Sequence, residues 1–292
     1  EMLGNRPALV CSIAERALEA HSFDHVVVSG YSRLQSNYHV SAFSQWFFRD
    51  RKKLLSDLKV LSKHDLNWRQ FTALERSLLA LSFVGKDRNW YSNYQRFYDG
   101  VRELGDSVSI VSCHIPTRSH PYSLLEHFLS STGMSLELED LESFDVRKNL
   151  SFHPVLIHGM SEYLSSLRPV QQSFFPLPHE GNRWLFRVCK RLSGGEDVMA
   201  EFDSLFSPRL QHSLIGHLDC RASSSNKQYC ELMSVDFNYF QPSDKASLLS
   251  EEELMALAVD AAQGRNTEDI ERFNRRIENA CMQSMRAEIV SS

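Results

Sequence analysis

The chain has 292 residues, of which 42% are hydrophobic and 24% charged, and its net charge is −5. These values are typical of a globular protein and exclude the collagen-like, disulfide-scaffold and low-complexity classes. The acidic balance argues against general nucleic-acid binding, which usually requires a basic surface, so we expect no nucleic-acid partner. Twelve glycines and nine prolines are few for this length, which favours a chain rich in helix.

The cysteines and the apolar runs indicate the cellular setting. The six cysteines are dispersed along the chain with no Cys-x-x-Cys pair, as expected of reduced thiols, and we therefore predict a cytoplasmic protein. No apolar run reaches the roughly 18 residues that a membrane-spanning helix needs. The sequence thus predicts no membrane span.

The first half of the chain alternates helical and strand patterns. Apolar spacing of three and four residues predicts helices, and β-branched or alternating runs predict strands. The predicted elements are a helix over 7–20, a strand over 25–29, helices over 40–61, 67–84 and 90–105, and a strand over 107–112.

The second half reads as mainly helical. We predict helices over 122–131, 151–167, 179–192, 198–206, 251–263 and 267–288. Ser250 with Glu253 forms a capping box, and Thr267 is the expected cap of the last helix. Residues 219–247 are rich in serine and are predicted to be irregular, with one short strand over 232–237. The order of elements predicts a helix-rich α/β fold, with a core over 1–150 and a helical part over 151–292 packed on it as one domain.

The strongest candidate site follows the first strand. Arg33 comes just after this strand, at the edge where open α/β sheets bind ligands. Ser41 lies eight residues further on and is expected in the first turn of the next helix. A guanidinium and a hydroxyl beside a helix N-terminus form a suitable clamp for a phosphate group. The alternative interpretation is a solvated arginine and an N-cap serine.

This element resembles one in the sulfotransferases that use 3′-phosphoadenosine-5′-phosphosulfate (PAPS). In that family a strand ends in an arginine, and a serine about eight residues later completes the site for the 3′-phosphate. The run His25-Val-Val-Val-Ser-Gly-Tyr-Ser-Arg33 with Ser41 is similar to it. A second register, similar to carbohydrate sulfotransferases, takes Arg33-Leu-Gln-Ser36-Asn-Tyr and makes Ser36 the phosphate ligand.

The resemblance continues in order over roughly residues 10–167. It includes the aromatic helix that begins at Trp90, the strand over 108–112, a helix that ends at Gly133 and the run Arg147-Lys-Asn-Leu-Ser151. The resemblance implies a P-loop-like three-layer parallel sheet. It also implies transfer of a sulfuryl group from PAPS to a hydroxyl of a glycan or small-molecule acceptor.

The chain departs from the family at three points, one of which is the absence of the family's late Gly-rich cofactor loop, unless Ser193-Gly-Gly195 stands in for it. The family's Gly-Thr/Ser-Thr loop, which grips the 5′-phosphosulfate, is not recognisable before residue 25, and the second strand is followed by Cys113-His114 instead of an acidic pair. A degenerate relative therefore remains an alternative. Such a chain would be a non-catalytic interaction or assembly protein on the same scaffold, with a protein partner or a second copy of itself.

Histidines supply the candidate general bases. Sulfuryl transfer needs a group that takes the proton of the acceptor hydroxyl. His114 lies at the end of a strand and His39 lies near the Arg33 and Ser41 element, so these two are the catalytic candidates. The alternative interpretation of each is a packed or exposed histidine.

Two further clusters of residues could bind ions, and each has a structural interpretation as well. The spacing of His212, His217, Cys220 and Cys230 does not match the usual paired zinc ligands, and we predict no metal site. The basic run over 49–53 is either a site that attracts anions or a solvated helix face.

Overall fold

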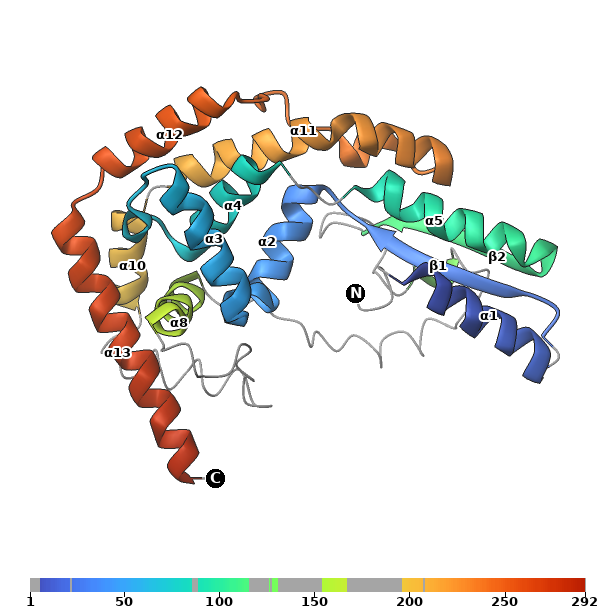
Figure 1. Ribbon diagram of the computed structural model, residues 1–292, viewed down its shortest axis with the longest axis horizontal. Helices are drawn as coiled ribbons and strands as arrows, with labels where there is room; N and C mark the ends of the chain where they lie inside the picture. Colours follow the sequence, from blue (N-terminus) through green and yellow to red (C-terminus); the bar gives the residue numbers. More distant parts are fainter. Residues whose placement is uncertain are drawn as a thin grey trace. The chain divides into compact units, whose positions relative to one another are not determined.

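A computed structural model describes residues 6–21, 23–85, 89–115, 126, 128–130, 154–166, 196–206 and 208–291. The described chain is rich in helix and contains a sheet of two parallel strands, as Figure 1 shows. The elements in chain order are α1 (Pro7–His21), β1 (Val26–Ser32), α2 (Gln35–Gln45), η2 (Phe47–Arg49), α3 (Arg51–Lys63), η3 (Trp68–Gln70), α4 (Ala73–Val84), α5 (Trp90–Glu103), η4 (Gly105–Ser107), β2 (Val108–His114), α8 (Pro154–Ser166), α10 (Glu196–Leu205), α11 (Arg209–Met233), η5 (Phe237–Phe240), α12 (Glu251–Gln263) and α13 (Thr267–Ser291). The predicted helix-rich α/β class is confirmed.

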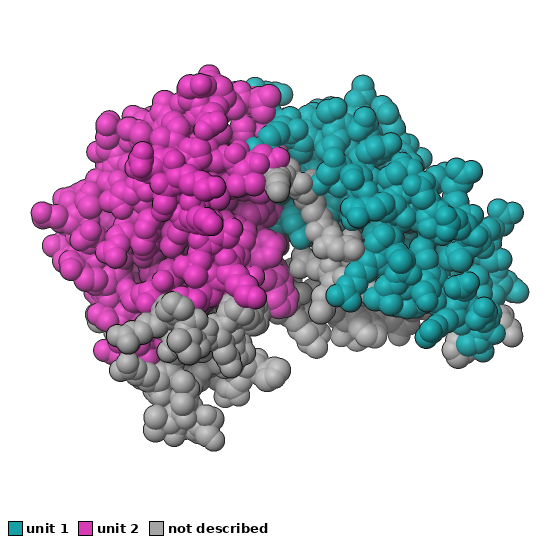
Figure 2. All heavy atoms as spheres, in the orientation of Figure 1, with its two compact units in different colours: residues 1–38, 87–149, 219–244 teal, residues 39–86, 150–218, 245–292 magenta. Residues whose placement is uncertain are grey.

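The chain forms two compact units, which Figure 2 shows in different colours. Unit 1 comprises Glu1–Tyr38, Asp87–Asn149 and Asp219–Asp244, and unit 2 comprises His39–Lys86, Leu150–Leu218 and Lys245–Ser292. Each unit takes segments from both sides of residue 150. The expected boundary at 150 therefore does not separate the two units.

Unit 1 is built on the parallel pair β1 and β2. Val26 pairs with Val108 at one end, and Ser32 pairs with His114 at the other. Because side chains alternate along a strand, Val26, Val28 and Val108 share one face, and α1 and α5 cover this face. Apolar side chains on these four elements thus form a small core.

A second core in unit 1 joins α5 to the end of α11. Trp90 and Tyr94 of α5 pack with Tyr229 of α11 and with Phe240 of η5. Gly30 of β1 allows this close packing, because a Cβ atom at position 30 would lie 2.6 Å from the hydroxyl oxygen of Tyr94. A glycine inside the strand is therefore explained by a neighbouring side chain.

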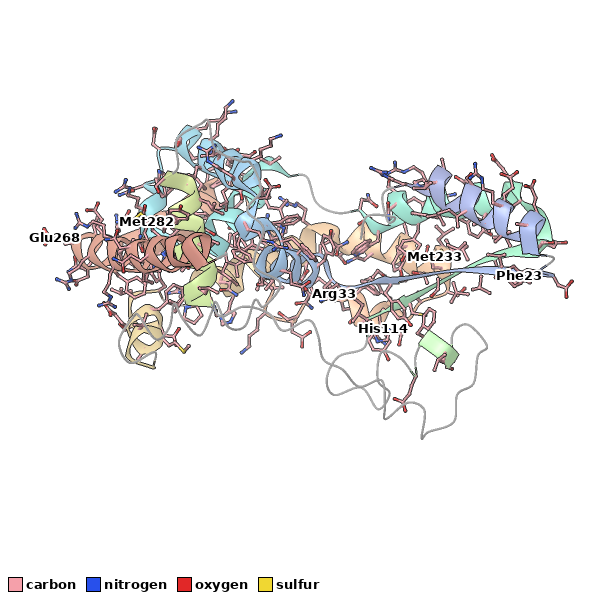
Figure 3. All side chains as sticks on the ribbon, turned by 90° about the horizontal axis from the view of Figure 1, so that it is seen from below. Phe23, Arg33, His114, Met233, Glu268 and Met282 are labelled. Atoms are coloured by element: carbon pink, nitrogen blue, oxygen red, sulfur yellow. The ribbon has the colours of Figure 1, made fainter. Side chains whose placement is uncertain are left out.

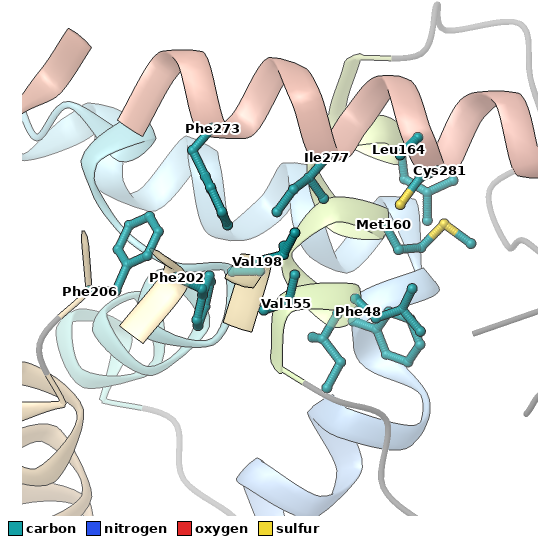
Figure 4. Close-up of a cluster of buried hydrophobic side chains, with 14 of the residues drawn as sticks. Phe48, Val155, Met160, Leu164, Val198, Phe202, Phe206, Phe273, Ile277 and Cys281 are labelled. Carbon is teal, nitrogen blue, oxygen red and sulfur yellow. The ribbon is translucent and has the colours of Figure 1, made fainter. Parts of the chain in front are cut away.

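Unit 2 is a helical body with a large aromatic core, shown in Figure 4. Helices α8 and α13 pack closely, and α3, α4 and α10 contact α8. The core side chains that Figure 4 labels are Phe48, Val155, Met160, Leu164, Val198, Phe202, Phe206, Phe273, Ile277 and Cys281. A neighbouring leucine-rich cluster joins α4 and α12 to the residues of α11 that belong to this unit.

Several predicted elements are confirmed and others are wrong. The helix over 7–20, both strands, the helix over 90–105 and the Ser250–Glu253 capping box are confirmed within a few residues. The predicted helix over 40–61 is interrupted, because α2 ends at Gln45 and α3 begins at Arg51 with Asp50 as its N-cap. The predicted helices over 122–131 and 179–192 lie almost wholly outside the described residues.

Two predictions for the second half are wrong. Residues 219–233 are not irregular but continue α11, so the predicted strand over 232–237 begins inside this helix and ends at Phe237, the first residue of the turn η5. Thr267 does not cap α13. Asn266 does so, because its side-chain oxygen accepts from the backbone N–H groups of Glu268 and Asp269.

Candidate site at the carboxyl edge of the sheet

The carboxyl ends of β1 and β2 bring two predicted site residues, Arg33 and His114, to one edge of the sheet. Ser32 and His114 are register partners, and the backbone N–H of Ile115 donates to the carbonyl of Ser32 at 2.8 Å. Arg33 follows Ser32 directly. Figure 3 shows Arg33 and His114 at the same end of the two strands. This is the edge at which parallel sheets bind ligands.

The backbone of Arg33 is held by an aromatic side chain. The indole Nε1–H of Trp90 donates to the Arg33 carbonyl at 2.7 Å. Tyr38 packs edge-on against the Trp90 ring, with centroids 5.4 Å apart. Helix α2 begins two residues after Arg33, so these contacts fix the turn between the strand and the helix.

His114 is covered by an aromatic ring. Tyr239 of η5 stacks on it, with centroids 3.4 Å apart and planes 9° from parallel. His114 is 8% exposed, whereas Tyr239 is 42% exposed. The stack sets the plane of the imidazole at the edge of the sheet.

Buried hydroxyl groups lie beside this edge. The Tyr229 hydroxyl is hydrogen-bonded to Ser32 Oγ and to Ser112 Oγ, the latter at 2.6 Å. Burial raises the pKa of Tyr229, so the phenol stays protonated at neutral pH. This chain of three hydroxyls ties both strands to α11.

The N-terminus of α2 is occupied by a carboxylate of the same chain. Ser36 is fully buried; its backbone N–H donates to Asp219 Oδ1 at 3.2 Å and its hydroxyl donates to Asp219 Oδ2 at 2.8 Å. Gln35 and Asn226 beside them exchange two amide hydrogen bonds of 2.6 and 2.9 Å. Asp219 thus stands where the register through Ser36 would put a phosphate, and it supplies the negative charge that a helix N-terminus favours.

Ser41 is not in the first turn of its helix. Helix α2 begins at Gln35, six residues before Ser41, because the chain becomes helical directly after β1. The Ser41 hydroxyl accepts from Gln45 Nε2 at 3.4 Å. Ser41 belongs to unit 2 and Arg33 to unit 1.

His39 lies in a buried polar cluster of unit 2. Its Nε2 is 3.0 Å from Ser77 Oγ, and Lys53 donates to Ser77 Oγ at 3.0 Å and to Asp57 Oδ2 at 2.6 Å. Burial, with a smaller effect from Lys53, lowers the pKa of His39 to about 3. A base this weak is poorly suited to general-base work, and His114, unlike His39, lies at the carboxyl edge of the sheet beside Arg33, so His114 is the better placed of the two histidines.

The candidate zinc ligands lie along one helix. His212, His217, Cys220 and Cys230 are all on α11, and the two cysteines are ten positions apart, or about 15 Å along the helix. The His217 Nδ1 accepts from the backbone N–H of Leu249 at 3.0 Å. Within the described ranges, no three His, Cys, Asp or Glu side chains are grouped so that they could hold a metal ion.

The polar residues of α11 were missed by the sequence analysis. Asp219, Asn226 and Tyr229 complete the edge of the sheet, but their segment was predicted to be irregular. A usable signal was the apolar spacing of four and seven residues through Leu218, Ala222 and Tyr229, which places them on one face of a helix and which serines 223–225 obscured.

Comparison with known proteins gives no match to a family model, to a curated protein or to a solved structure. None of the helices described here is both long and apolar enough to cross a membrane.

Proposed function

We propose that the carboxyl edge of β1 and β2 binds the donor nucleotide of a sulfotransferase-like reaction. The observation that supports this most is the parallel register, in which Ser32 pairs with His114 and Arg33 follows at the same edge. One guanidinium and one imidazole beside the turn into α2 are the two groups that phosphate binding and proton transfer require.

The proposed reaction moves a sulfuryl group from PAPS to an acceptor hydroxyl of a glycan or small metabolite. The bond between sulfur and the 5′-phosphate oxygen breaks, and a bond forms between sulfur and the acceptor oxygen. His114 takes the proton of the acceptor hydroxyl, and adenosine 3′,5′-bisphosphate is the second product. Arg33 neutralises phosphate charge on the nucleotide, so the chain contributes positioning and electrostatics without a covalent intermediate.

The proposal includes a three-layer fold, of which the described residues show two parallel strands and the helices on one face. A parallel sheet normally has both faces covered, as in a three-layer P-loop-like fold. Helices α1 and α5 cover the face that carries Val28, whereas Val27 on the other face is 36% exposed. A half-exposed valine in a parallel strand supports a further layer on that face.

Calorimetric titration with adenosine 3′,5′-bisphosphate tests the proposal. We expect binding by the wild-type protein and a 10- to 100-fold weaker affinity for Arg33→Ala, roughly the loss of one hydrogen-bonded charge pair. The matched control is Arg96→Ala, because Arg96 is exposed on α5 of the same unit and donates to the Ser92 carbonyl. Absence of heat with millimolar ligand, or equal affinities for all three proteins, would refute the proposal.

A second function is favoured by one observation. Asp219 occupies the N-terminus of α2, and its carboxylate would repel a phosphate there. This geometry supports the non-catalytic alternative, in which the scaffold serves an interaction or assembly role. Light scattering that shows a stoichiometric complex or an obligate oligomer, together with no nucleotide binding in the titration, is the result that this alternative predicts.

A further inference from the structure

Helix α3 of unit 2 has one face of exposed lysines. Leu54, Asp57 and Leu61 point into the protein and are buried. Lys52, Lys59 and Lys63 are exposed. At about 100° per residue these three lysines fall within about 40° of one another around the helix axis, and they span about 16 Å along it. They therefore form a row on the side opposite the buried face.

The row has a strong local charge. Helix α3 contains five basic residues and one acidic residue, a net charge of +4 in a chain whose net charge is −5. Three acidic groups beside α3 have other partners: Asp57 binds Lys53, Asp50 accepts from the backbone N–H groups at the start of α3, and Glu251 lies 3.6 Å from Nδ1 of His64 at its end. Among the described residues, no carboxylate forms an ion pair with Lys52, Lys59 or Lys63.

Two large apolar side chains in the same stretch of the chain are also exposed. Trp46, just before η2, is 45% exposed, and Leu55 on α3 is 37% exposed. The guanidinium carbon of Arg49 lies 4.9 Å from the centroid of the Trp46 ring. A half-exposed tryptophan with an arginine on its ring, close in sequence to a row of lysines, is the combination found where proteins meet the headgroup layer of a membrane.

The shape and chemistry of the exposed lysine side of α3 indicate what kind of partner it binds. The face is a helix surface and not a pocket, so it fits an extended surface better than a small ligand. Lysines act as point charges, whereas bidentate phosphate recognition usually relies on arginine. Exposed Trp46 and Leu55 favour a partner with an apolar layer beneath its charges, which an anionic membrane has and a hydrated polyanion lacks. We propose that the α3 face, defined as Lys52, Lys59, Lys63, Leu55 and Trp46, docks on an anionic lipid surface.

This docking is peripheral and independent of the proposed sulfotransferase activity. Each lysine near an anionic membrane contributes about a fivefold factor in affinity, so the three together contribute on the order of 100-fold. The attraction acts within roughly one Debye length, about 10 Å, so distant acidic residues do not cancel it. The binding should weaken steeply as salt is added.

Vesicle co-sedimentation tests this inference. The probes are vesicles of phosphatidylcholine alone and of phosphatidylcholine mixed equally with phosphatidylglycerol. We expect the protein to bind only the anionic vesicles, and the variant Lys52→Glu/Lys59→Glu/Lys63→Glu to bind at least 100-fold more weakly. The control is Lys227→Glu/Lys245→Glu/Arg275→Glu, which makes the same change of charge at exposed positions elsewhere and should bind more tightly than the α3 variant.

A second variant separates docking from folding. Trp46→Ser changes no charge and should weaken binding to anionic vesicles, while circular dichroism shows that the protein remains folded. The inference is overturned if the two charge-reversal variants bind equally, or if the protein binds both kinds of vesicle alike. It is also overturned if the wild-type protein binds a soluble polyanion such as single-stranded DNA or a polyuronate but no vesicle.

Discussion

At the scale of single residues, the buried histidine His158 makes the stability of unit 2 depend on pH. Its Nδ1 accepts from the backbone N–H of Ala73 at 3.1 Å, so the ring proton is on Nε2, which is 2.8 Å from Asn274 Oδ1. Burial lowers the pKa of His158 to about 4, although Glu162 opposes the change. The folded protein therefore holds this imidazole neutral.

This predicts a loss of stability in mild acid. In the unfolded chain the histidine pKa is about 6.5, so between pH 6.5 and 4 the unfolded state binds more protons than the folded state. The contribution of the neutral His158 ring to the free energy of unfolding is fully present above pH 6.5. Below that pH it falls by on the order of 1 kcal/mol for each pH unit. Urea unfolding at a series of pH values measures this slope.

The variant His158→Gln isolates the contribution of one residue. It should lower stability at pH 7 but give a shallower slope between pH 6.5 and 4.5 than the wild-type protein. His212→Gln, which removes an exposed imidazole from α11, is the control for the substitution itself. Equal slopes in wild type and His158→Gln would show that protonation of His158 is not coupled to unfolding.

At the scale of elements, the contact between α8 and α13 depends on one glycine. A Cβ atom added to Gly159 would overlap Cγ2 of Ile277 and would lie 3.1 Å from Cys281 Sγ. Both residues of α13 are fully buried in the core, so they have little room to move. Gly159 therefore lets the two helices approach closely.

Gly159→Ala should thus destabilise the protein, although alanine is the better helix former. We expect the free energy of unfolding to fall by about 1–3 kcal/mol, the usual cost of overpacking a core. Gly264→Ala is the matched control, since its nearest atom would be 3.7 Å away and its φ is −73°. Urea denaturation measures the free energy of unfolding of both variants. A Gly159→Ala protein as stable as wild type would contradict the packing described for α8 and α13.

Element positions could be predicted from the sequence where the pattern is local. The β-branched run at 26–28 and the alternation after Ser107 each identify a strand, and Ser250 with Glu253 identifies a helix start. The break between α2 and α3 was missed, because the apolar spacing continues across the turn that Asp50 caps. The start of α2 was missed for the opposite reason: its first residues include the polar side chains of Gln35, Ser36 and His39, which are buried by hydrogen bonds to distant side chains.

At the scale of the whole molecule, the candidate site is made by contacts that no local pattern carries. Tyr229 joins Ser32 and Ser112, which are 197 and 117 residues away in the sequence. Arg33 and His114 could be predicted at one edge, because the carboxyl ends of parallel strands lie together. Asp219 could not, since its role depends on α11 returning to the first residues of α2.

The same long-range contacts explain why each of the two compact units is built from segments that lie far apart in the sequence. Unit 1 takes three separate segments and unit 2 takes three others. The boundary near residue 150 is expected from the order of the predicted elements, because the second half of the chain is mainly helical. Pairing between remote segments, as between Ser36 and Asp219, brings residues from both halves of the chain into unit 1.

The central claim is that the carboxyl edge of β1 and β2 binds a donor nucleotide. Hydrogen exchange of the wild-type protein, followed peptide by peptide with and without adenosine 3′,5′-bisphosphate, tests it most directly. The account predicts slower exchange in 30–38 and 111–115, where the strands end and α2 begins, with little change along α12 and α13. Unchanged exchange at saturating ligand, or protection confined to unit 2, would contradict it.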